Sequence, residues 1–199
     1  MSIRILLSLT LTLMCTAPGW AGVEEAMDAT DRGDYTAAMK EWLPLAQNGL
    51  PEAQYVIAIF YRQGLGVPPD MKESARWMQR AAQGGNAQAQ YYIGTMYAMG
   101  EGGFPVDFKE AVRFFRLGAE QGHEGCMARL GSHYEFGEGV PQDYVVAHMW
   151  YHLASAAGDR DAAAIREEVA LKMTPAQIAE ARRLAQEWKP KGMATPLSH

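Results

Sequence analysis

The chain has 199 residues, of which 48% are hydrophobic and 21% charged, and its formal net charge is −5. This composition excludes a disordered chain, and the length suits one domain or one short array of repeats. Lysine and arginine form no cluster along the sequence, so we expect neither a nucleic-acid partner nor an anionic membrane surface as the target, because both require positive charge.

Residues 1–21 have the three-part layout of a secretory signal peptide. Arg4 supplies the positive start, residues 5–15 are almost all apolar, and residues 18–21 break the helix and end on a small residue. The apolar run is too short to cross a bilayer core of roughly 30 Å. We therefore predict cleavage after Ala21, a periplasmic or secreted mature protein, and no membrane span once the signal is removed.

The two cysteines bear on this prediction. Cys15 lies inside the apolar run but follows Met14, not a small residue, so a lipoprotein is the weaker alternative. The predicted mature chain keeps only Cys126, which leaves no pair for an internal disulfide. Packing must then stabilise the fold.

After this segment the chain contains an internal repeat. The glycines that close the units, Gly49, Gly85, Gly122 and Gly158, lie 36, 37 and 36 residues apart. Each unit also has a tyrosine, two closely spaced glycines, a proline and an aspartate in fixed order. The tyrosines are Tyr61, Tyr97 and Tyr134, and the aspartates are Asp70, Asp107 and Asp143. We predict an array over residues 22–158, with a partial repeat at 23–49 and full repeats at about 50–85, 86–122 and 123–158.

Each repeat is predicted to be an antiparallel helical hairpin. Apolar residues recur at helical spacing between residues 52 and 63, and Gly64 then ends that helix. Asp70 caps the second helix, and Glu73 three residues later completes a pattern similar to a capping box. A single hairpin cannot bury its own apolar face, so neighbouring hairpins must stack into a solenoid.

The two ends of the array are predicted from weaker signals. Residues 23–32 indicate one helix at the start of the partial repeat. Beyond the array, residues 162–172 are helical, and Thr174, Pro175 and Gln177 start a last helix that runs to about Trp188. We interpret residues 159–189 as a capping helical pair and residues 190–199 as a flexible tail.

The repeat as a whole resembles the Sel1-like repeat family, which is related to tetratricopeptide hairpins. The resemblance covers roughly residues 34–158 and rests on Ala-Gln-Tyr, the Gly-x-Gly-Val-Pro-x-Asp loop, Ala-x-x-Trp and the closing glycine. It implies an all-α, right-handed α-solenoid of antiparallel hairpins. Ala58, Cys126 and Gly118 depart from the usual pattern without threatening this fold.

Candidate chemical sites are few. His148 and His152 lie four residues apart on a predicted helix, as two metal ligands could, but no third ligand is identifiable and we favour a solvated helix face. Cys126 replaces an alanine, which favours a buried thiol over a reactive one. The glycine-rich loops lack the lysine of a phosphate-binding loop. We predict no enzyme, no cofactor and no metal site.

Positions that vary between repeats on the first helix are candidates for partner contact. Spacings of three and four place each set on one helix face, which in such arrays lines the concave side. These positions are Val56, Ile59 and Gln63, then Tyr92, Thr95 and Met99, then Arg129, Ser132 and Phe136. The alternative is that neighbouring hairpins cover part of this set.

The sequence thus predicts an exported, non-catalytic scaffold or adaptor that binds a protein or peptide in the cell envelope. Resemblance to the family leaves two alternatives open. One is a hydrolase similar to cysteine-rich Sel1-like proteins linked to β-lactams, although those have a disulfide in each repeat. The other is a purely structural oligomer built by edge-to-edge stacking of hairpins.

Overall fold

The structure is a computed structural model that describes residues 22–191. The predicted signal peptide lies outside the described residues, as does most of the predicted tail, residues 192–199. Between residues 22 and 191 the chain forms ten α-helices and no strand, so the prediction of an all-α solenoid fold is confirmed. The chain divides into two compact units that meet at Ala89 and Gln90, and each is described by itself.

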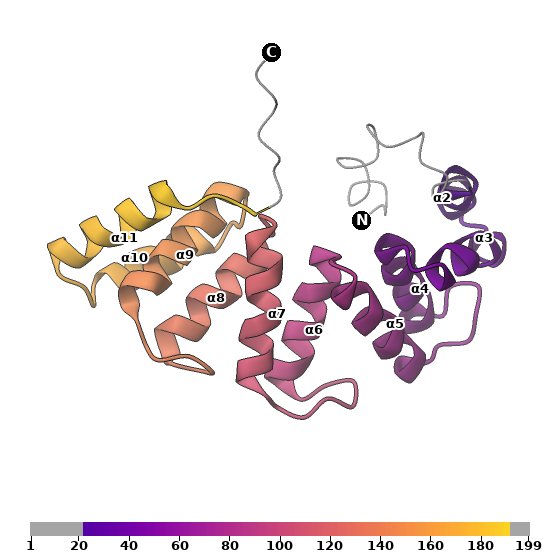
Figure 1. The fold of residues 1–199 in the computed structure, drawn as a ribbon, viewed down its shortest axis with the longest axis horizontal. Helices are drawn as coiled ribbons and strands as arrows, with labels where there is room; N and C mark the ends of the chain where they lie inside the picture. The colour runs from indigo at the N-terminus through magenta and orange to yellow at the C-terminus, as the bar shows by residue number, and fades with distance from the viewer. Residues whose placement is uncertain (1–21, 192–199) are drawn as a thin grey trace, which may run out of the picture. The chain divides into compact units, whose positions relative to one another are not determined.

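The first unit contains α2 (Val23–Asp31), α3 (Tyr35–Gln47), α4 (Pro51–Gln63) and α5 (Met71–Gln83), shown in indigo to purple in Figure 1. α3 packs on α2 and α4, and α4 packs on α5. Trp42, Phe60 and Met78 are fully buried between these helices. The indole nitrogen of Trp42 donates a hydrogen bond of 3.0 Å to the Thr30 hydroxyl, so the one polar atom of this side chain has a partner.

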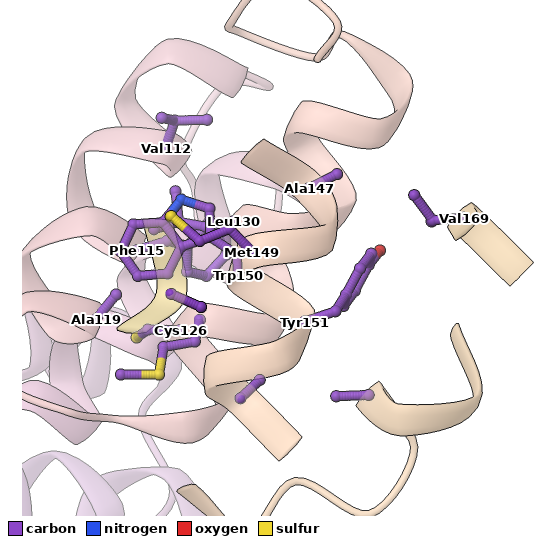
Figure 2. Packing of buried hydrophobic residues seen from close by; sticks show 14 of the residues in the cluster. Val112, Phe115, Ala119, Cys126, Leu130, Ala147, Met149, Trp150, Tyr151 and Val169 are labelled. Carbon is purple, nitrogen blue, oxygen red and sulfur yellow. The ribbon is translucent and has the colours of Figure 1, made fainter. Parts of the chain in front are cut away.

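The second unit begins within α6 (Ala87–Met99), which runs across the division between the units. It continues through α7 (Phe108–Glu120), α8 (Glu124–Phe136), α9 (Tyr144–Ala157), α10 (Ala162–Ala170) and α11 (Pro175–Glu187). α8 packs on α7 and α9, and α9 also packs on α10 and α11. Figure 2 shows the core of this unit, where Phe115, Leu130, Tyr151 and Val169 come from different helices.

The predicted aspartate caps are confirmed in every repeat. The carboxylate of Asp70 accepts from the backbone N–H groups of Lys72 and Glu73 at 2.9 and 3.0 Å. Asp107 and Asp143 cap α7 and α9 in the same way. Each such bond satisfies a donor that has no partner within its own helix.

The capping aspartate also closes the loop inside each repeat. Its backbone N–H donates to the carbonyl of the repeat's tyrosine at 2.9 Å. These pairs are Asp70 with Tyr61, Asp107 with Tyr97, and Asp143 with Tyr134. In the predicted capping-box pattern the Glu73 carboxylate would accept from the backbone N–H of Asp70. That N–H already donates to the Tyr61 carbonyl, and the Glu73 carboxylate pairs with Arg76 at 2.8 Å instead.

The second glycine of the loop lies against the start of an earlier helix. A Cβ on Gly66 would lie 2.3 Å from the carbonyl oxygen of Tyr35, and one on Gly139 would lie 2.3 Å from that of Phe108. Both glycines also have φ near +70°, a conformation that side chains with a Cβ disfavour. Only glycine fits these two positions.

The terminal helices are close to their predicted bounds. α2 ends at Asp31, one residue before the predicted end, and α10 ends at Ala170, two residues early. The capping box of Thr174 and Gln177 is present at the start of α11. From residue 22 to residue 191, none of the helices combines the length and the apolar character needed to cross a membrane.

Candidate interaction surface

The variable positions of α6 and α8 are accessible. Met99 and Phe136, at the ends of these helices, are 61% and 63% exposed. Tyr92, Thr95 and Ser132 are half-buried, and Arg129 is exposed. The spacing of each trio places its three residues on one face of its helix.

The corresponding positions of α4 are different. Val56 is 2% exposed and Ile59 is 9% exposed, so both belong to the core of the first unit. Only Gln63, at the end of the helix, is exposed. α4 packs on both α3 and α5, and burial against its neighbours removes Val56 and Ile59 from the surface that the sequence pattern had suggested.

α6 and α8 lie side by side within the second unit. The ring of Tyr91 on α6 stacks on the imidazole of His123, the residue that caps α8, with a centroid distance of 5.5 Å. A Cβ on Gly125 would lie 3.0 Å from the same tyrosine ring. Glycine at position 125 therefore allows the start of α8 to approach α6.

This pair of faces carries little charge. α6 contains no charged residue. Arg129 on α8 forms no ion pair with any residue between 22 and 191. Burial lowers the pKa of the nearby His133, and the charge of Arg129 adds a smaller effect in the same direction. Phe136, Met99 and Tyr92 add apolar area to these two faces, and aromatic and arginine side chains are common at interface hot spots.

The sequence did not predict a polar network at the end of the array. The buried carboxylate of Glu135 on α8 accepts from the Tyr151 hydroxyl at 3.1 Å and from the Lys172 amine at 2.8 Å. Burial, followed by the charge of Glu135, raises the pKa of Tyr151 above its ordinary value. Lys172 follows α10, so this network fastens the C-terminal helices to the last repeat. The corresponding residues, Arg62 and Ala98, gave no signal for it.

His148 and His152 do share one side of α9, as predicted, but His148 is only 2% exposed, so the prediction of a solvated helix face is wrong for this residue. The guanidinium of Arg166 lies 3.1 Å from Nδ1 of His152, and burial, Arg166 and Arg182 all lower the pKa of both histidines. No three histidine, cysteine or acidic side chains between residues 22 and 191 come together as a metal-binding group. With a guanidinium bound to one imidazole, this pair is poorly suited to a cation.

Cys126 is fully buried in the core of the second unit, among Phe115, Leu130 and Trp150 (Figure 2). Burial strongly raises the pKa of its thiol. A buried thiol in its protonated form is neither a nucleophile nor a metal ligand at neutral pH, so this side chain acts as a small apolar residue.

Comparisons with known proteins agree with this geometry. Residues 51–86, 87–123 and 125–159, more than half of the chain, match the family model described as Sel1 repeat. A protective antigen present in uropathogenic Escherichia coli strains, with an SLR fold, is 37% identical with a TM-score of 0.64 over 71% of this chain. A Sel1 repeat protein from Oxalobacter formigenes is 31% identical with a TM-score of 0.71 over 76% of this chain. This chain covers only 31% and 45% of those two proteins. No curated protein matches the sequence.

Proposed function

This chain belongs to the Sel1 repeat family, whose members generally serve as scaffolds for protein interactions, and we propose that it is a non-catalytic adaptor that binds a protein partner in the bacterial cell envelope. The observation that carries the proposal is the accessible pair of faces on α6 and α8. We name it the α6–α8 surface and define it by Tyr92, Thr95, Met99, Arg129, Ser132 and Phe136.

The chemistry of this surface supports a peptide segment as the ligand. Met99 and Phe136 are large apolar side chains held at the ends of rigid helices, and burying either one against a partner contributes about 1.5–3 kcal/mol by area. Arg129 without an ion pair within residues 22–191 favours a partner that presents a carboxylate beside its apolar side chains. The Thr95 hydroxyl already donates to the Tyr91 carbonyl at 2.9 Å, and the Ser132 hydroxyl bonds Tyr151, so Arg129 is the group that would bind this carboxylate.

The non-catalytic part of the proposal rests on what the candidate groups do in the fold. Asp70, Asp107 and Asp143 are occupied as helix caps, and Cys126 is buried as a protonated thiol. The histidines of α9 are buried or bound by Arg166. These groups have structural roles, and none presents a nucleophile or base at an accessible site.

The envelope location rests on the layout of residues 1–21. One structurally similar protein is a protective antigen, a property that fits an exported array. A fusion of residues 1–21 to alkaline phosphatase, which is active only after export, tests this part of the proposal separately. A fusion that remains inactive, while a known signal peptide restores activity, would contradict it.

The binding surface is tested by site-specific crosslinking in living cells. A photo-crosslinking amino acid at Phe136 or at Met99 should join the chain to one defined protein. The same group at Met71, which is exposed on the first unit, is the matched control and should give no such product. Combining Tyr92→Ala with Arg129→Glu should remove the product, and folding is checked by circular dichroism.

Three outcomes would contradict the proposed surface. A product that survives the double substitution would place the binding site elsewhere on the chain. Crosslinks only to a second copy of the chain would favour a structural oligomer over an adaptor. If the protein is exported and folded but gives no crosslinked product, the proposal that this surface binds a partner is wrong.

A further inference from the structure

His148 is the buried group that no role described so far explains. It is the fifth residue after the capping aspartate Asp143, and the equivalent residues in the two preceding repeats are Ala75 and Val112. All three are buried, and His148 is only 2% exposed. Its Nδ1 has no hydrogen-bond partner among residues 22–191. The last repeat therefore places a titratable, unsatisfied side chain where an apolar one suffices.

The surroundings of His148 are positively charged. α9 packs on α8, α10 and α11. The charged and titratable groups that act on His148 are Arg166 and Glu167 from α10, Arg182 from α11, and His152 from α9 itself. From α8, Arg129 and Glu135 act on Tyr151, further along α9.

Within residues 22–191, Glu167 is the one negative group that acts on His148 against these charges. The Glu167 carboxylate is already paired with Arg166 at 2.6 Å. Nη1 of Arg166 lies 3.1 Å from Nδ1 of His152. Because a guanidinium can only donate hydrogen bonds, the Nδ1 of His152 must be unprotonated in this contact. The arrangement therefore suits two neutral imidazoles and opposes a proton on either.

We propose that His148 makes the docking of α10 and α11 on α9 sensitive to pH, so that this C-terminal pair loosens under mildly acidic conditions. A proton on His148 would be a buried cation between α9 and the arginines of α10 and α11. The imidazole accepts that proton more readily when the pair lifts away and water reaches the ring. Protons then favour the open state by mass action.

The expected direction follows from linkage. Burial, then Arg166 and Arg182, holds the pKa of His148 below its ordinary value near 6.5 while the pair is docked. The free energy that favours docking is therefore at its full value above about pH 6.5 and decreases as the pH falls below this value. At a pH below the pKa of His148 in both states, the open state is about tenfold more populated, relative to neutral pH, for each unit by which that pKa is higher in the open state than in the docked state.

Hydrogen exchange of the full-length chain between pH 7.5 and 5.0, corrected for the intrinsic pH dependence of exchange, tests this proposal. We expect amides of residues 162–187 to lose protection by about tenfold or more as the pH falls. Amides of residues 51–83 provide an internal reference because that segment contains no histidine. The Trp188 ring lies 5.8 Å from that of Trp150, so tryptophan fluorescence should report the same transition.

Two variants separate this mechanism from general acid sensitivity. His148→Val installs the residue that Val112 supplies in the preceding repeat, and it should abolish most of the pH response. Arg182→Gln removes an exposed positive charge and should reduce the response without affecting the core. A full response in His148→Val, or an equal loss of protection in residues 51–83, would overturn the proposal.

Discussion

The ring of Phe115 lies so close to Gly94 that a Cβ on this glycine would be 2.6 Å from the Cε1 atom of the ring. Gly131 and Tyr151 repeat the relationship in the next repeat, with a closest distance of 2.9 Å. In the first full repeat the equivalent residues are Ala58 and Met78. Glycine thus occurs where the opposing residue is a rigid aromatic ring, and alanine occurs where it is the flexible side chain of methionine.

This relationship predicts a compensating pair of substitutions. Gly94→Ala should lower the free energy of unfolding by about 1–3 kcal/mol, because the methyl group overpacks the Phe115 ring. Adding Phe115→Met recreates the pair found at Ala58 and Met78 and should recover part of that loss. Urea denaturation of the two single variants and the double variant measures the coupling energy. Strictly additive effects would contradict the predicted contact.

Two glycines with positive φ predict a contrast between a crowded position and an open one. Gly66 and Gly85 both have positive φ, but a Cβ on Gly85 would meet open space. Gly85→Ala should cost about 1–2 kcal/mol from the left-handed conformation alone. Gly66→Ala should cost about 1–3 kcal/mol more, since its Cβ would collide with the Tyr35 carbonyl. Equal thermal unfolding midpoints for the two variants would exclude the close approach.

The cap of α9 predicts a graded series at Asp143. Asp143→Ala removes the acceptor for the backbone N–H groups of Val145 and Val146 and should cost about 1 kcal/mol. Asp143→Asn retains an acceptor oxygen and should cost less. Chemical denaturation measures both, and an asparagine variant as unstable as the alanine variant would show that the cap bond is not the cause.

A second pH effect is predicted at the start of α8. Nδ1 of His123 accepts from the backbone N–H of Cys126 at 3.3 Å, and burial lowers the pKa of His123 below its ordinary value. The folded state therefore loses stability as pH falls below about 6.5, by at most about 1.4 kcal/mol per pH unit for one group. Protonation would also occupy the nitrogen that accepts the cap bond.

His123→Asn is the matched variant for this effect. Asn86 caps the preceding repeat through the same contact, at 2.9 Å to the N–H of Ala89. The variant should keep the cap and show a shallower fall in unfolding free energy between pH 6.5 and 5. An unchanged slope in urea titrations at several pH values would assign the effect to other groups.

Cys126 offers a chemical test of the packed core. Its thiol is buried and its pKa is raised, so we expect Ellman's reagent to react with native protein at pH 8 only as fast as the protein opens. Reaction in urea should be complete within the mixing time. Rapid labelling of the native protein would contradict both the burial and the structural role of this cysteine.

Much of the fold could be predicted because the repeat marks its own boundaries. The glycines that end helices and the aspartates that begin them recur at fixed spacing, and each acts through local backbone geometry. The role of Glu73 could not be predicted in the same way. Its carboxylate could bond the backbone N–H of Asp70 only if that N–H were available. The N–H donates instead to the Tyr61 carbonyl, a contact across the loop that local sequence does not reveal.

The candidate surface was harder to predict than the fold. Val56 and Arg129 occupy equivalent positions, yet one is buried and the other exposed. A periodic pattern states which residues share a helix face but not which neighbouring helices cover it. Glu135 and His148 have no glutamate or histidine equivalents in the preceding repeats, so no recurring pattern indicated which residues they would contact.

The bond from each capping aspartate to its tyrosine has a consequence for how such chains change length over evolution. Both partners lie within one repeat, so a duplicated stretch of gene that encodes a whole repeat also duplicates the bond that closes its loop. The inserted copy needs no matching change elsewhere to form its own turn. Recombination between repeats can thus lengthen or shorten the protein in whole units, while the network around Glu135 remains at the end.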